Sequence, residues 1–131
     1  MTFKSGRASA AIAAITLLAT AAFAADVKGE IVTAIEHAEY SADANDIQNV
    51  HLHLYHALNC LVGPNGNGFT ANQMNPCANA GNGIIPDTAD AKKKAALEAA
   101  AARARAGLAT TDIPTAKADA AFVAKTLKSM Q

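Results

Sequence analysis

The chain has 131 residues, and its 11 lysine and arginine side chains balance 11 aspartate and glutamate side chains, so the formal net charge is zero. This length leads us to expect a single modest domain. The balanced charge gives no basis for nucleic-acid binding, which requires a basic surface.

The N-terminus has the pattern of a secretory signal peptide. Lys4 and Arg7 precede an uncharged, apolar stretch over residues 8–25, and Ala22 and Ala24 are the small side chains that signal peptidase recognises. We therefore expect residues 1–24 to be cleaved, leaving one helical domain over residues 25–131, or 131 − 24 = 107 residues. The stretch is short and alanine-rich for a retained anchor, and no second apolar run follows, so we expect no membrane span in the mature chain. The signal predicts a periplasmic or secreted protein.

Cys60 and Cys77 are the only two cysteines of the chain. Because an exported protein meets an oxidising compartment, we expect them to form a disulfide across 16 intervening residues. The alternative is a pair of free thiolates that bind Cu(I). It has less support because the spacing is far wider than the C-x-x-C of dedicated thiolate sites, and the absence of C-x-x-C-H excludes c-type haem.

Apolar residues recur at helical spacing in four segments of the mature chain, and no strand-like alternation of useful length is present. The predicted helices cover residues 26–42, 45–62, 87–107 and 115–130. Their predicted buried residues include Val27, Ile31, Ala34, Ile35 and Ala38, then Ile47, Val50, Leu54, Leu58 and Leu61, and finally Ala116, Ala120, Val123, Leu127 and Met130.

Polar and glycine residues mark the ends of these segments. Asn45 or Asp46 is expected to cap the second helix, and Asp87 or Thr88 the third, because their side chains can accept a hydrogen bond from a first-turn N–H. Gly107 is expected to end the third helix as a C-terminal glycine.

A long loop over residues 63–86 separates the second and third predicted helices. It is dense in glycine, asparagine and proline, which favour turns over either regular period. Because a disulfide ties it, we expect an ordered loop, held to the core by Phe69, Met74, Ile84 and Ile85. The predicted fold is all-α, a small antiparallel four-helix bundle with a long disulfide-tied loop between its second and third helices.

Residues 47–86 contain no aspartate, glutamate, lysine or arginine. Exposed faces of soluble proteins normally carry such charges. We therefore expect this segment either to be buried by the rest of the chain or to form a contact surface. One interpretation is that the second helix is the most buried and the loop lies over it. The other is a recognition surface for a protein partner.

All four histidines lie in the first two predicted helices: His37, then His51, His53 and His56. At 100° per residue, His53 and His56 share one face with Cys60, whereas His51 lies at the edge of the leucine stripe. Two histidines at i and i+3 are close enough to chelate one ion. In a helical hairpin, His37 would lie at the height of His51 or His53 and could complete the site.

Other ligands remain open, since Glu30, Glu36 or Met74 could also contribute. Histidine with methionine favours copper, and histidine with carboxylate favours zinc or iron, so the sequence leaves the metal among Cu, Zn and Fe. Each histidine also has an ordinary interpretation. His51, for example, could be a half-buried side chain bonded to a backbone carbonyl, and clustered histidines could instead sense acid.

The sequence carries no serine-nucleophile or phosphate-loop motif, so we do not expect an enzyme. Two functions of different class follow from these patterns. The first is an exported helical metal-binding protein that uses His53, His56, His37 and His51. The second is a non-catalytic structural or interaction protein, in which the charge-free segment 47–86 forms the contact surface.

Overall fold

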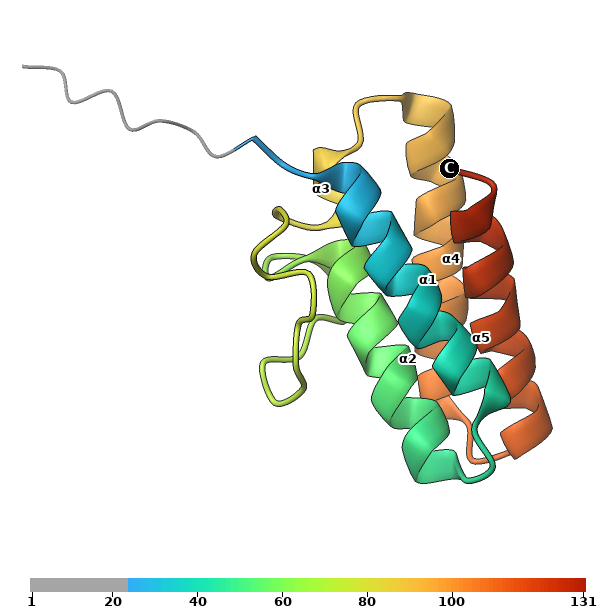
Figure 1. Ribbon diagram of the computed structural model, residues 1–131. Helices are drawn as coiled ribbons and strands as arrows, with labels where there is room; N and C mark the ends of the chain where they lie inside the picture. Colours follow the sequence, from blue (N-terminus) through green and yellow to red (C-terminus); the bar gives the residue numbers. More distant parts are fainter. Residues whose placement is uncertain (1–23) are drawn as a thin grey trace, which may run out of the picture.

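The computed structural model describes residues 24–131, so the predicted signal peptide lies almost wholly outside the described residues. The described chain is all-helical, with five helices and no strand: α1 (Val27–Asp43), α2 (Ile47–Val62), α3 (Ile84–Asp87), α4 (Ala91–Ala109) and α5 (Ile113–Lys128). Figure 1 shows the four long helices side by side, with the loop after α2 on the outer side of that helix. No helix within residues 24–131 is both long and apolar enough to cross a membrane.

Each long helix begins after an aspartate whose carboxylate accepts a backbone N–H three residues later. The caps are Asp26, Asp46, Asp90 and Asp112. Such caps satisfy N–H groups that have no partner within the helix. The capping prediction is confirmed for α2, but it is wrong for the third predicted helix, since α4 starts after Asp90. Asp87 instead ends the short helix α3, which lies within the predicted loop and its border, and binds the Asn82 backbone and side chain.

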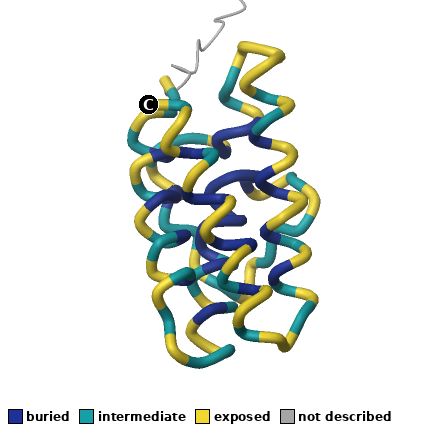
Figure 2. Tube along the Cα trace, turned by 90° about the vertical axis from the view of Figure 1, so that its right-hand side faces the viewer, coloured by how far each residue is buried: buried dark blue, intermediate teal, exposed yellow. Residues whose placement is uncertain are grey.

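The core lies where the apolar stripes of the long helices meet, and Figure 2 shows buried segments facing the interior of the molecule. α1 packs on α2 and α5, and α4 packs on the same two helices. The predicted stripes are buried except for Val27, Ile47 and Met130, which lie at helix ends and are half-buried. Alanines fill much of the core, among them Ala34, Ala38, Ala57, Ala100, Ala104 and Ala120.

Gly107 does not end α4, which continues to Ala109. A Cβ atom on this residue would lie 2.8 Å from Leu54 Cδ2 and 3.0 Å from Asp119 Cβ. The glycine therefore lets α4 approach α2 and α5 closely, a role that depends on tertiary packing and that local sequence signals do not distinguish from a C-cap.

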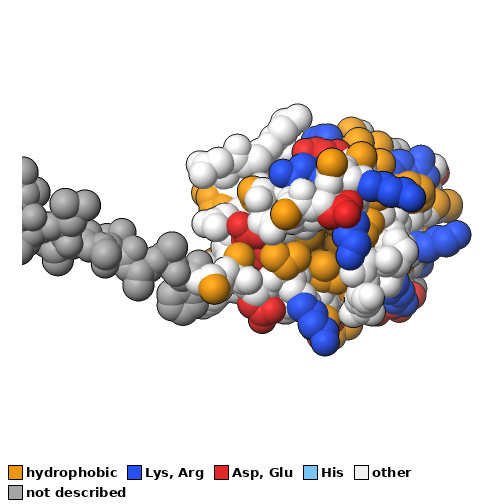
Figure 3. All heavy atoms as spheres, turned by 90° about the horizontal axis from the view of Figure 1, so that it is seen from above, with side chains coloured by type: hydrophobic (Ala, Val, Ile, Leu, Met, Phe, Trp, Pro, Cys, Tyr) orange, Lys and Arg blue, Asp and Glu red, His pale blue; other side chains and the backbone are white. Residues whose placement is uncertain are grey.

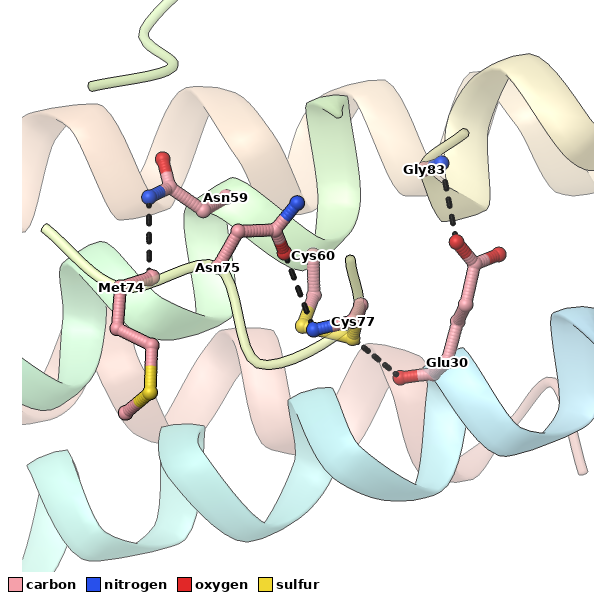
Figure 4. Close-up of a disulfide and its surroundings, with 7 residues drawn as sticks. All are labelled: Glu30, Asn59, Cys60, Met74, Asn75, Cys77 and Gly83. Atoms are coloured by element: carbon pink, nitrogen blue, oxygen red, sulfur yellow. Dashed lines mark hydrogen bonds between the residues drawn. A yellow bond between two sulfur atoms is a disulfide. The ribbon is translucent and has the colours of Figure 1, made fainter. Parts of the chain in front are cut away.

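The Cys60–Cys77 disulfide predicted from the sequence is present, and it joins α2 to the loop. Asn59, which precedes Cys60 in α2, also holds this loop in place. Its fully buried side chain forms hydrogen bonds with four backbone groups of residues 70–74. Figure 4 shows the disulfide and Asn59 gathering the loop against α2. Ile84 and Ile85 are buried and Phe69 packs on the core, whereas Met74 is 59% exposed and is not an anchor.

The loop is closed at its base by two glycines with positive φ, Gly63 (68°) and Gly83 (118°). A Cβ on Gly83 would lie 2.6 Å from the Gly63 nitrogen, so the two backbones approach more closely than any side chain permits. Together, the loop and the disulfide cover the second half of α2, in which every residue from 56 to 62 is buried. This burial explains why that half of the helix carries no charge, and it favours the first interpretation of the charge-free segment.

Glu30 is the one fully buried acidic side chain among the described residues. Its Oε1 accepts the Gly83 N–H at 3.0 Å, while Oε2 has no hydrogen-bond partner (Figure 4). Burial raises the pKa of this carboxyl group to about 7, and the nearby charges of Asp87 and Asp26 act in the same direction, against the Gly83 hydrogen bond. Glu30 thus links α1 to the base of the loop.

A hollow of about 480 Å³ opens at the end of the molecule where α1 begins. Figure 3 views this end and shows hydrophobic side chains with charged ones around them. The apolar lining comes mainly from Val27, Ile31, Leu97 and Met130, and the charged lining from two lysines and two aspartates. Because acidic and basic groups balance here, the hollow has no net preference for an anion or a cation.

Candidate metal centre

Three of the four histidines converge between α1 and α2. His37 projects from the middle of α1, and His53 and His56 project from α2 one turn apart, on the face predicted from the helical wheel. Because α1 and α2 are joined by a three-residue connection, residues 44–46, positions roughly equidistant from it lie at similar heights along the two helices. The Ser41 hydroxyl, which donates to the Val50 carbonyl at 2.7 Å, holds the helices together between this connection and the histidines.

Each of the three side chains offers one ring nitrogen, and these nitrogens all lie within 4.8 Å of one another. The Nδ1 atoms of His37 and His53 are 3.3 Å apart, so one of them carries the proton that it donates to the other. The His56 ring stands nearly perpendicular to both other rings, with centroids 4.9 Å from His37 and 5.8 Å from His53.

These separations can be compared with what a metal ion requires. Zinc–nitrogen bonds of about 2.0–2.1 Å in a tetrahedral arrangement place two ligand nitrogens about 3.3–3.4 Å apart. The His37–His53 pair already has this separation. No two nitrogens of the group are more than 4.8 Å apart, so a pair must approach by at most about 1.4 Å to reach about 3.4 Å.

The surroundings of His37 and His56 favour the neutral imidazole, the form that binds a metal ion. His56 is only 5% exposed, and burial together with the neighbouring His37 and His53 lowers its pKa to about 4. Burial lowers the pKa of His37 too, with a further contribution from His53 that the nearby Glu36 opposes. In addition, His56 Nδ1 is buried without a hydrogen-bond partner, so a lone pair or a proton there is unsatisfied.

Tyr40 borders the cluster on its solvent side. Its ring lies edge-on to His37 and His53, with centroids 6.0 Å and 5.3 Å away, and its hydroxyl donates to Glu36 at 2.6 Å. The sequence interpretation did not include Tyr40, although its position three residues after His37 places it on the same face of α1.

His51 lies apart from the other three histidines. Its Nε2 is 2.9 Å from the Thr110 carbonyl oxygen and 3.1 Å from that of Gly107, at the end of α4. Because carbonyl oxygens only accept, Nε2 carries the proton and donates it there. This is the ordinary interpretation considered from the sequence, a half-buried histidine bonded to the backbone.

The other ligands considered from the sequence are engaged or located elsewhere. Glu30 binds Gly83, Glu36 accepts from Tyr40, and Met74 is exposed in the loop. Within residues 24–131, the only group of three or more histidine, cysteine and acidic side chains that could hold a metal ion is His37, His53 and His56.

Comparison of the chain with protein-family models, with curated proteins and with solved structures gives no match.

Proposed function

We propose that the protein binds one late first-row transition-metal ion, Zn²⁺ or Cu²⁺, through His37, His53 and His56. The main support is the convergence of three imidazoles from two helices, with one pair of nitrogens already 3.3 Å apart. Imidazole suits Zn, Cu, Fe and Ni, and the absence of a thioether or carboxylate from this set gives no reason to favour Cu(I) or iron.

Two further properties of the site support binding. The lowered pKa values of His37 and His56 mean that few protons compete with the ion at neutral pH. Coordination through His56 Nδ1, which is buried without a hydrogen-bond partner, would satisfy that atom.

The direct test is a titration of the protein with Zn²⁺ and Cu²⁺, with single His→Ala variants at positions 37, 53 and 56. One ion per chain and a loss of at least tenfold in affinity for each variant are expected. His51→Ala is the matched control, because His51 lies on the same helix and binds the end of α4 instead. Affinity that is unchanged in the triple variant, with helicity retained, would contradict the proposed site.

Binding should also stabilise the fold. An ion at 100 times its dissociation constant contributes about 2.7 kcal/mol. In a domain of about 100 residues this raises the melting temperature by about 10 °C. A thermal scan with and without Zn²⁺ therefore gives a second readout, and the His51→Ala variant should show the same shift.

We further infer that the protein acts after export, in the periplasm or outside the cell. The pattern of residues 1–24 supports this, as does the Cys60–Cys77 disulfide, which persists in oxidising compartments. Expression of the whole chain in a Gram-negative bacterium, followed by mass analysis of the periplasmic product, is expected to find an N-terminus at Ala25. An intact N-terminus in the membrane or cytoplasmic fraction would contradict this inference.

The proposed architecture is the antiparallel four-helix bundle expected from the sequence. The three-residue connections 44–46 and 110–112 support it, because such short links reverse the chain between neighbouring helices. The alternative function, a contact surface over residues 47–86, has less support since residues 56–62 are all buried, against the other helices or the loop. The exposed large apolar side chains within residues 47–86 are Leu52 and Met74.

A further inference from the structure

The proposed metal site would be coordinatively incomplete. Three ring nitrogens form the group within residues 24–131, and a tetrahedral ion requires four ligands. Sites with three protein ligands keep their fourth position open to water or another molecule. What that position accepts depends on where it faces and on the charge around it.

The buried side of the site is His56, and the open side is formed by His37 and His53, which are half-buried. On this side lies a shallow hollow of about 350 Å³, lined by His53, Tyr40 and the connection between α1 and α2. Its size suits a side chain or a small molecule. Tyr40 lines the hollow and also lies edge-on to His37 and His53, and its hydroxyl donates to Glu36.

The charge of the hollow is negative. Asp43 and Asp46 line it, and its lining includes no lysine or arginine. Asp46 is the cap of α2, whereas Asp43 lies at the C-terminal end of α1, where a carboxylate gains nothing from the helix dipole. These carboxylates repel anionic donors such as acetate and leave neutral nitrogen donors unopposed.

We propose that the fourth position of the ion, facing this hollow, accepts an imidazole from outside the chain. This inference rests on the proposed function. The donor is a neutral imidazole, either free or on a histidine side chain. Basic residues next to that histidine would be attracted to the carboxylates of Asp43 and Asp46. A site of this kind can pass its ion to, or receive it from, a histidine-bearing molecule.

The test uses the mature protein loaded with Co²⁺, whose visible spectrum reports its ligands. If the protein takes up none of Co²⁺, Zn²⁺ and Cu²⁺, the proposed function itself is overturned. If the Co²⁺ spectrum appears, imidazole at pH 7.5 is expected to change it saturably, at concentrations at least tenfold lower than acetate. No change with imidazole, or equal potency of acetate, would overturn the further inference alone.

Two short peptides test the charge argument, a histidine flanked by lysines and a histidine flanked by aspartates. The lysine-flanked peptide is expected to act at concentrations below those of free imidazole, and the aspartate-flanked peptide above them. This order of potency distinguishes an imidazole donated by a histidine of a protein partner from free imidazole. Equal potency of the two peptides would remove the electrostatic basis of the proposal.

Asp43→Asn is the matching variant, because this side chain is exposed and does not cap a helix. Because this variant removes one exposed charge, the ratio between the concentrations at which the two peptides act is expected to fall by about threefold. Glu98→Gln, an equivalent change on the exposed face of α4, serves as the control and should leave the difference unchanged. An equal effect of both variants would contradict a local role for Asp43.

Discussion

Replacement of Glu30 by glutamine should stabilise the protein at alkaline pH. The carboxyl group is fully buried, with Oε1 bonded to the Gly83 N–H and Oε2 without a partner. Glutamine has nearly the same shape and retains an oxygen for Gly83, but it cannot ionise. The change therefore removes a buried charge and preserves the link between α1 and the base of the loop.

The size of the effect follows from the pKa of Glu30, which burial raises from 4.5 to about 7. A group whose pKa is raised on folding favours the folded state below its unfolded pKa, and this contribution is lost as the pH rises through the folded value. The difference of about 2.5 pKa units corresponds to about 3 kcal/mol above pH 7. Because the new amide N–H₂ also lacks a partner, we expect a net gain of about 2 kcal/mol for Glu30→Gln at pH 8.

The measurement is urea unfolding of both proteins at pH 5 and pH 8, without metal. His37 and His56 have lowered pKa values, so their contributions fall as the pH drops below 6.5, opposite to Glu30. The difference between variant and parent cancels these contributions and isolates Glu30. Glu98→Gln, on an exposed face, is the control. A Glu30→Gln protein that is less stable than its parent at both pH values would refute the assigned role of this carboxyl group.

Three other changes test the packing of the loop and helices. Replacing both Cys60 and Cys77 by serine should lower the free energy of unfolding by about 3 kcal/mol, since the closed loop has 16 intervening residues; an unchanged urea midpoint would contradict this. Gly107→Ala should cost about 1–3 kcal/mol through overpacking against Leu54, and a neutral result would mean that α4 shifts freely. His51→Ala should cost about 1–2 kcal/mol by losing its bonds to the end of α4, with metal affinity unchanged; reduced metal affinity would place His51 in the site.

Local patterns predicted much of this fold because they reflect local forces. Helical spacing located the long helices and most of their buried residues, and the pairing of the only two cysteines followed from the expectation of an oxidising compartment. The details that failed depend on neighbours distant in sequence. Gly107 continues its helix because Leu54 and Asp119 crowd it, and Met74 stays exposed because Asn59 binds its backbone and leaves the side chain outside.

The same distinction holds for the candidate metal site. The i, i+3 spacing selected His53 and His56, and the hairpin argument placed His37 at their height. The helical wheel already placed His51 on another part of α2, but its partners could not be predicted, because they belong to α4, whose position beside α2 is set by tertiary packing. The burial of Glu30 had a signal, since this residue lies four positions before Ala34 on the buried stripe of α1.

The most direct test of the proposed metal centre is a crystal structure of residues 25–131 grown with Zn²⁺, with anomalous data recorded at the zinc edge. We expect one peak per chain, about 2.0–2.1 Å from a ring nitrogen of each of His37, His53 and His56. Peaks confined to other side chains, with these three histidines in contact only with one another, would contradict the proposed site.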